Sequence, residues 1–107
     1  MSLNKVLITG SSGGLGNYLA KYFSKKGHDL LIHGRNEEKL KSTQEEIKRN
    51  GVKVQYIVAD LNKNNDINLL CEKAKQEKIK ILINNAGIPC PNLSFEDITN
   101  DIINSMV

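Results

Sequence analysis

No apolar run in this sequence is long enough to cross a membrane, because the longest, such as YIVA and ILI, hold only a few residues. The N-terminus leads into a strand-like run and lacks the apolar core of a signal peptide. Cysteine is scarce as well, and Cys71 with Cys90 makes neither a disulfide framework nor a metal-ligand spacing. We therefore expect a cytoplasmic protein with two reduced thiols, no metal site and no membrane partner.

Charge of one sign does not dominate, since 15 Lys and Arg stand against 12 Asp and Glu, a net charge of +3. The basic residues are scattered among acidic ones and form no stripe interleaved with aromatic residues. We therefore expect no nucleic-acid partner. The length of 107 residues and the 39% hydrophobic content are typical of a single globular domain.

The sequence does contain a regular alternation of short apolar runs and longer amphipathic segments. The runs predict four buried strands, over residues 5–9, 29–33, 52–59 and 79–84. Apolar residues at helical spacing predict a helix after the first strand, another capped by Asn36 over residues 37–50, and a third around Ile67. Ser94 with Asp97 three positions later predicts the cap of a fourth helix that runs to the chain end.

This order, βαβαβαβα, predicts an α/β fold with a parallel sheet that helices cover on both faces. Right-handed crossovers give a Rossmann-like doubly wound sheet with its first four strands in the order 3-2-1-4. Strand four would then be an apolar edge strand, which we expect to be paired or covered.

The stretch TGSSGGLG, residues 9–16, lies where the first strand gives way to the first helix. The N–H groups at a helix N-terminus attract phosphate, and glycines let the phosphate approach the backbone. We expect Gly10 to make the turn, Gly14 to admit the phosphates and Gly16 to let helix and strand pack closely. A glycine-rich loop alone can be a plain turn, but the strand before it and the helix after it favour a dinucleotide site. The predicted cofactor-binding residues of this loop are Gly10, Ser11, Ser12, Gly14, Leu15 and Gly16.

The end of the second strand reads HGRN, so Gly34 and Arg35 stand where an NAD-binding site has an acidic residue. The Arg35 guanidinium can bind a 2′-phosphate through two parallel hydrogen bonds, which predicts NADP in preference to NAD. The alternative is an exposed Arg35 that pairs with Glu37 or Glu38. We expect His33, at the same strand end, to be structural.

These motifs resemble the short-chain dehydrogenase/reductase family. TGSSGGLG fits the family's TGxxxGxG pattern and also the TGxxGxxG pattern of its longer, epimerase-like branch, whereas NNAG at residues 84–87 is similar to a tetrapeptide of the shorter, single-domain branch. The resemblance implies that Asn85, Ala86 and Gly87 lie along the adenosine ribose. It also implies that Asp60 accepts from the adenine amino group, with Leu61 in the same cofactor site.

Members of this family transfer a hydride between NADP(H) and an alcohol or carbonyl carbon, using a serine and a Tyr-x-x-x-Lys pair. That spacing occurs here at Tyr22 and Lys26, but Tyr22 lies in the core-facing stripe of the first helix, so we predict no catalytic role for it. No catalytic residue is assigned. The resemblance implies that residues 1–107 are the N-terminal portion of an NAD(P)-binding domain, inactive without a catalytic C-terminal portion.

The leading hypothesis is an NADP-dependent oxidoreductase of this type, acting on a small carbonyl or secondary-alcohol substrate and forming homo-oligomers when full length. The second hypothesis is a non-catalytic nucleotide-binding or interaction module. Such a module would use the open edge of strand four to dimerise or to dock a partner strand.

Overall fold

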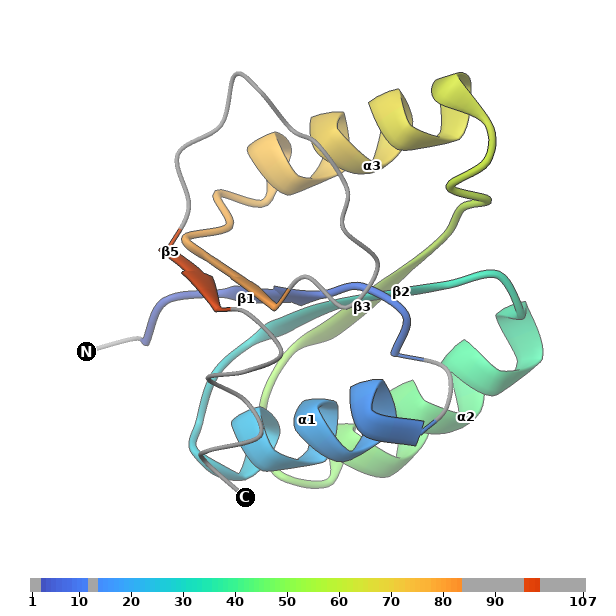
Figure 1. The fold of residues 1–107 in the computed structure, drawn as a ribbon. Coiled ribbons are helices and arrows are strands. Elements are labelled where there is room, and N and C mark those ends of the chain that lie inside the picture. The colour runs from blue at the N-terminus through green and yellow to red at the C-terminus, as the bar shows by residue number, and fades with distance from the viewer. Residues whose placement is uncertain (1–2, 12–13, 84–95, 99–107) are drawn as a thin grey trace.

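The structure is a computed structural model that describes residues 3–11, 14–83 and 96–98. Within these residues, parallel strands form one sheet in the order β3-β2-β1-β4-β5. The strands are β1 (Val6–Ile8), β2 (Leu30–Gly34), β3 (Val54–Val58), β4 (Ile81–Ile83) and β5 (Glu96–Ile98). The helices are α1 (Gly14–Lys25), α2 (Glu37–Lys48) and α3 (Asn64–Gln76). Helices α1 and α2 cover one face of the sheet and α3 covers the other (Figure 1), which confirms the predicted doubly wound fold.

The central strand β1 is buried on both faces, which explains why it is apolar throughout rather than alternating. Val6 and Ile8 belong to the core cluster that includes Leu19 and Phe23 of α1. Leu7, between them, belongs to the cluster on the α3 side. Successive side chains of a strand point to opposite faces, so this short run contributes to both halves of the core.

The segment before the chain end differs from the prediction. Glu96–Ile98 forms β5, parallel to β4, with Ile98 opposite Ile83, so the expected helix is wrong for residues 96–98. The cap pattern is a local signal, whereas the open edge of β4 offers unpaired N–H and C=O groups to a strand. The edge of β4 that the second hypothesis required for a partner is therefore occupied by β5. Ser94 and residues 99–107 lie outside the described residues.

One expectation from composition is also wrong. Cys71, in α3, is disulfide-bonded in the structure rather than a reduced thiol, while Cys90 lies outside the described residues. In the part of the chain that the structure describes, no helix combines the length and the apolar character needed to cross a membrane. The cytoplasmic location stays a prediction.

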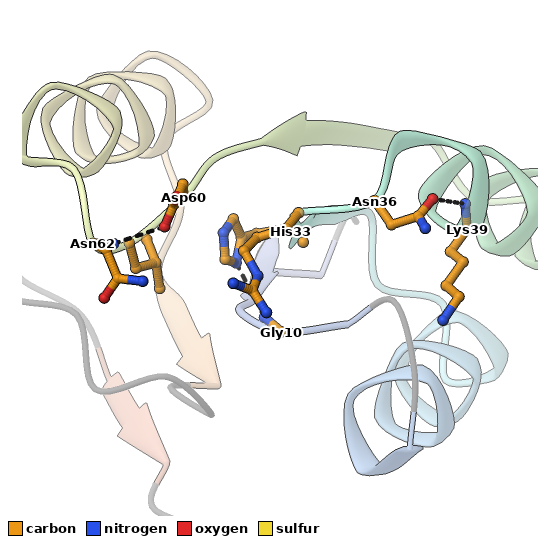
Figure 2. Close-up of a pocket in the computed structure, with 9 residues that line it drawn as sticks. Gly10, His33, Asn36, Lys39, Asp60 and Asn62 are labelled. Atoms are coloured by element: carbon orange, nitrogen blue, oxygen red, sulfur yellow. Dashed lines mark hydrogen bonds between the residues drawn. The ribbon is translucent and has the colours of Figure 1, made fainter.

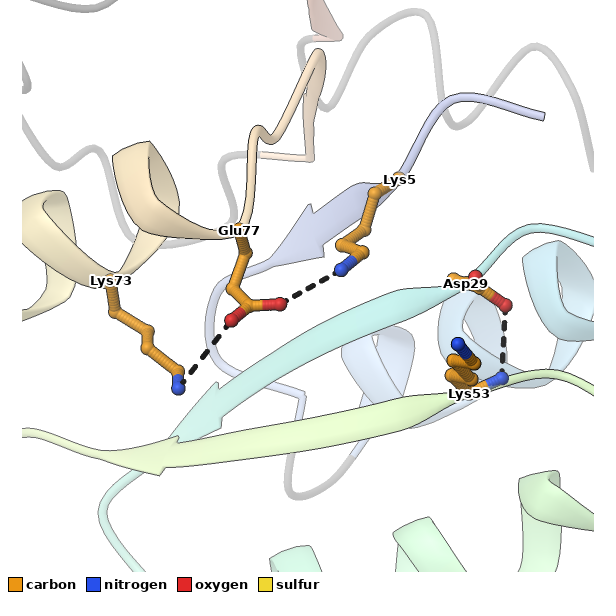
Figure 3. Close-up of polar contacts among 5 residues, drawn as sticks. All are labelled: Lys5, Asp29, Lys53, Lys73 and Glu77. Atoms are coloured by element: carbon orange, nitrogen blue, oxygen red, sulfur yellow. Dashed lines mark hydrogen bonds and ion pairs between the residues drawn. The ribbon is translucent and has the colours of Figure 1, made fainter. Parts of the chain in front are cut away.

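Polar contacts join the segments that enter the sheet at its amino edge (Figure 3). The Lys5 ammonium, just before β1, donates to Glu77 Oε1 at 2.8 Å, and Lys73 Nζ lies 3.7 Å from Glu77 Oε2. Asp29 Oδ1, before β2, accepts from the backbone N–H of Lys53 at 2.9 Å. These contacts connect the segments at the amino ends of the strands. A pocket lies at the opposite side, at the carboxyl ends of the strands.

Candidate cofactor-binding site

A pocket of about 530 Å³ lies at the carboxyl ends of β1, β2 and β3 (Figure 2). In open α/β sheets, ligands bind outside the carboxyl ends of the strands. Three loops contribute to the pocket: the glycine-rich loop, the turn from β2 into α2, and the segment from β3 to α3. The residues that line it are Gly10, His33, Gly34, Arg35, Asn36, Lys39, Asp60, Leu61 and Asn62.

The glycine-rich loop has the backbone geometry expected of a tight turn before a helix. Gly10 has φ 65° and Gly14, the first residue of α1, has φ 55°, a region that favours glycine. A Cβ atom on Gly16 would lie 2.7 Å from Ser11 Cα and would overlap the carbonyl oxygen of Gly10. Only a glycine at position 16 therefore lets α1 pack this closely against the turn.

Gly14 differs from Gly16 because nothing lies within 4 Å of the position that its Cβ would occupy. The space is open at the N-terminus of α1, where backbone N–H groups have no partner within the helix. No acidic residue stands in the first turn of α1 to repel an anion. An open helix N-terminus without a nearby carboxylate favours the binding of an anion such as phosphate.

Ser11 and Leu15, which were predicted to contact the cofactor, have other contacts. The Ser11 hydroxyl is buried and bonds to the backbone of His33, with Oγ 2.9 Å from the carbonyl oxygen and 3.0 Å from the backbone nitrogen. Leu15 packs against the core cluster beneath α1. Neither residue lines the pocket. The predicted residues Ser12, Asn85, Ala86 and Gly87 lie outside the described residues.

Two cationic side chains line the pocket at the turn from β2 into α2. Arg35 was predicted; Lys39 was not, although it stands one helical turn further on. Asn36 caps α2 by accepting the Lys39 backbone N–H at 3.1 Å, as expected, which fixes where the helix begins. Within the described part of the chain, no ion pair joins Arg35 to Glu37 or Glu38, and Glu37 Oε2 instead accepts from the Tyr56 hydroxyl at 3.1 Å.

The predicted adenine contact, Asp60, lines the pocket together with Leu61. Asp60 Oδ1 accepts from the Asn62 backbone N–H at 3.0 Å, which orients the carboxylate. The backbone N–H of Asp60 donates to Asp66 Oδ2 at 2.8 Å, which ties this loop to the first turn of α3. No sequence pattern indicated a role for Asp66, because its contact depends on how the loop folds back.

His33 lies at the centre of these loops, at the end of β2. Its ring is buried, and its Nδ1 accepts from the Gly10 backbone N–H at 3.1 Å. Nε2 lies 2.9 Å from the carbonyl oxygen of Ala59, after β3. Burial lowers the pKa of His33 below its ordinary value, and the bond to Ala59 opposes this shift. The expectation of a structural histidine is compatible with these contacts, but the ring also lines the pocket.

The model of the short chain dehydrogenase family matches residues 4–107. The chain belongs to this family. Among curated proteins, the 17-beta-hydroxysteroid dehydrogenase type 3 of Danio rerio is 37% identical to this chain in an alignment 116 residues long. The alignment covers 99% of this chain and 38% of that protein. The chain therefore spans well under half the length of this relative.

Solved structures of short-chain dehydrogenases have the same fold. A short-chain dehydrogenase from Sphingobium yanoikuyae in complex with NADPH matches with a TM-score of 0.75 and 37% identity, over 79% of this chain and 34% of that one. NAD+-bound xylitol dehydrogenase matches with a TM-score of 0.71 and 24% identity, over 78% of this chain and 33% of that one, a likeness that shows the fold alone. Both nicotinamide cofactors thus occur among the structural neighbours.

The Tyr-x-x-x-Lys spacing of this chain lies away from the pocket. Tyr22 packs against the core with its ring centroid 5.2 Å from that of Phe23, and Lys26 Nζ lies 5.6 Å from the Tyr22 ring centroid. Tyr22 stands in the last turn of α1 and Lys26 directly follows the helix, whereas the N-terminal end of α1 follows the glycine-rich loop. Neither side chain lines the pocket.

Proposed function

We propose that this chain is the cofactor-binding part of an NADP-dependent oxidoreductase, which transfers a hydride between NADP(H) and a carbonyl or secondary-alcohol carbon. One observation carries the proposal: a single pocket joins the turn of Gly10 to the cations Arg35 and Lys39 and to the carboxylate of Asp60. Membership of the short-chain dehydrogenase family supports the reaction class. We place the catalytic groups and the substrate pocket outside residues 1–107.

In this proposal, the pyrophosphate of the cofactor lies over Gly10 and Gly14 at the N-terminus of α1. The helix dipole and the unpaired N–H groups there stabilise negative charge. The adenine lies toward Asp60, whose Oδ2 has no hydrogen-bond partner among the described residues and can accept from the adenine amino group. These two anchors place the adenosine ribose near the end of β2.

The ribose 2′ position then faces Arg35 and Lys39, with Gly34 where an NAD-binding site has an acid. Two cations and no carboxylate at this point favour a 2′-phosphate over a 2′-hydroxyl. The first turn of α2 does carry Glu37 and Glu38, but neither lines the pocket. We therefore propose NADP as the preferred cofactor.

Replacing Arg35 by Asp tests this preference. We expect Arg35→Asp to weaken NADPH binding by about tenfold to a hundredfold, because a charge-assisted hydrogen bond contributes about 1.5–3 kcal/mol. NADH, which has no 2′-phosphate, should be affected by less than about threefold. Calorimetric titration of the purified full-length protein with each cofactor measures both affinities.

Arg49→Asp is the matched control, because it makes the same charge change at the C-cap of α2, away from the pocket. It should leave both affinities unchanged. If Arg35→Asp weakens NADPH and NADH equally, Arg35 does not recognise the 2′-phosphate. Oxidation of NADPH in the presence of small carbonyl compounds, followed by its absorbance, tests the reaction itself.

A further inference from the structure

The His33 ring connects three chain segments that meet at the pocket. On one side, its Nδ1 is 3.1 Å from the backbone nitrogen of Gly10, the first glycine of the loop (Figure 2). On the other side, its Nε2 is 2.9 Å from the carbonyl oxygen of Ala59, which precedes the adenine-side residue Asp60. His33 is 3% exposed, so both ring bonds are shielded from water.

These two bonds determine which ring nitrogen carries the proton. A backbone carbonyl only accepts, so the hydrogen of the His33–Ala59 bond must be on Nε2. A backbone N–H only donates, so Nδ1 must be bare to accept from Gly10. The geometry therefore requires the neutral ring with its proton on Nε2. The lowered pKa of His33 agrees with this requirement, because burial disfavours the charged ring.

The Gly10 backbone is the point at which the turn is fixed. Its φ of 65° turns the chain, and its carbonyl oxygen packs directly against Gly16 of α1. Ser11, the next residue, is held by the backbone of His33 through its N–H, 2.7 Å from the His33 carbonyl oxygen. The end of β2 thus holds two successive residues of the loop, and only the bond to Gly10 uses the histidine side chain.

We propose that His33 is a positioning residue for the dinucleotide: its bare Nδ1 holds the Gly10 N–H and so sets the turn that receives the pyrophosphate. This inference rests on the proposed function, because it assumes that the glycine-rich loop binds the dinucleotide. The role differs from a purely structural one in that it needs an acceptor at the Nδ1 position, and not merely a ring that fills space.

Two variants of His33 distinguish the role of the Nδ1 acceptor from that of the Nε2 donor. In His33→Asn, the side-chain oxygen can take the place of Nδ1 and accept from Gly10, while the bond to Ala59 is lost. In His33→Gln, the longer amide can take the place of Nε2 and donate to Ala59, while the bond to Gly10 is lost. Each variant loses one ring hydrogen bond, so we expect the two variants to lose similar amounts of stability.

We expect His33→Gln to raise the Kd for NADP+ by about fivefold or more, the loss of one hydrogen bond, and His33→Asn to stay within about twofold of wild type. Calorimetric titration of the full-length protein at about pH 8, where histidine is neutral, gives each Kd. Thermal unfolding of each variant, measured in parallel, should show losses of similar size. His28→Asn, in the turn between α1 and β2, is the control that leaves the Kd unchanged.

The ring state is read directly from nitrogen NMR of the same protein. The structure requires opposite tautomers for the two histidines, because His28 bonds to the carbonyl oxygen of Asn4 through Nδ1, at 2.7 Å. A protonated Nδ1 in His33 would overturn the proposal. So would a Kd for His33→Gln equal to that of wild type, or one for His33→Asn that is weakened as much as for His33→Gln. A wild-type protein that binds no dinucleotide would instead refute the proposed function.

Discussion

At the scale of single residues, burial of the His33 ring makes the stability of the fold depend on pH. Desolvation lowers its pKa below the ordinary value of 6.5. In the unfolded chain, the ring gains a proton as the pH falls below about 6.5, whereas in the folded chain it does so only at lower pH. Falling pH therefore favours unfolding. This contribution to stability is complete above about pH 6.5 and is lost as the pH falls toward the folded-state pKa.

We expect the difference in the free energy of unfolding between wild type and His33→Asn to shrink as the pH falls below about 6.5, because asparagine does not titrate. Urea titration over a range of pH measures it. The charged side chains that share the pocket with the ring are Arg35 and Lys39, at the turn into α2, and Asp60, after β3. Their own titration occurs in both proteins and cancels in the difference, whereas ionisation of the ring occurs only in wild type. A difference that stays constant from about pH 8 to about pH 5 would contradict the prediction.

The contacts of His33 show what kind of information the sequence did and did not contain. Parallel pairing of β1 with β2 places Ile8 opposite Ile32, so the residues that follow, Thr9 and His33, lie side by side. The register thus contained a signal that His33 adjoins the glycine-rich loop. It did not determine the ring orientation or the bond to Ala59, because side-chain torsions are set by packing from other segments.

At the scale of elements, the order of strands and helices was predictable because short apolar runs alternate with segments of helical spacing. That order also places Arg35 and Asp60 at one edge of the sheet, because each follows the carboxyl end of a strand. Strand β5 was not predictable in the same way. Glu96–Ile98 is a strand because β4 lies beside it, which is a long-range effect that no local pattern encodes.

The N-terminus of α1 allows a controlled test of the phosphate site. We expect Gly14→Ala to weaken NADPH binding by at least about tenfold, because its Cβ would enter the open space in which we propose that backbone N–H groups bind the phosphates. Gly51→Ala is the control: Gly51 has φ 82° and nothing within 4 Å of its Cβ position, but it lies in the turn before β3 at the other edge of the sheet. Both variants strain the backbone, so thermal unfolding should show comparable losses. Equal affinities for NADPH in the two variants would refute a phosphate site at Gly14.

At the scale of the whole molecule, the amino and carboxyl ends of the parallel strands carry different features. The pocket lies at the carboxyl ends of the strands, while an ion pair at the amino ends joins distant segments. The bond from Lys5 to Glu77 links residues 72 positions apart, before β1 and after α3 (Figure 3). The hydrogen bond from Lys5, together with the charges of Lys5 and Lys73, holds the pKa of Glu77 below its ordinary value, against the opposing effect of burial.

We expect Glu77→Gln to lower the free energy of unfolding by about 0.5–1 kcal/mol at neutral pH and low salt, the upper range for such pairs, because the pair is partly buried and Glu77 also meets Lys73. Because the pKa of Glu77 is lowered on folding, this difference should be complete above about pH 4.5 and disappear as the pH falls below that value. Glu46→Gln, which breaks a more exposed pair with Lys21, should cost less. Urea titration measures both losses. Equal losses would show that the Lys5–Glu77 pair stabilises the fold no more than an exposed ion pair does. Since Glu77 is far from the pocket, the Kd for NADPH should not change in either variant.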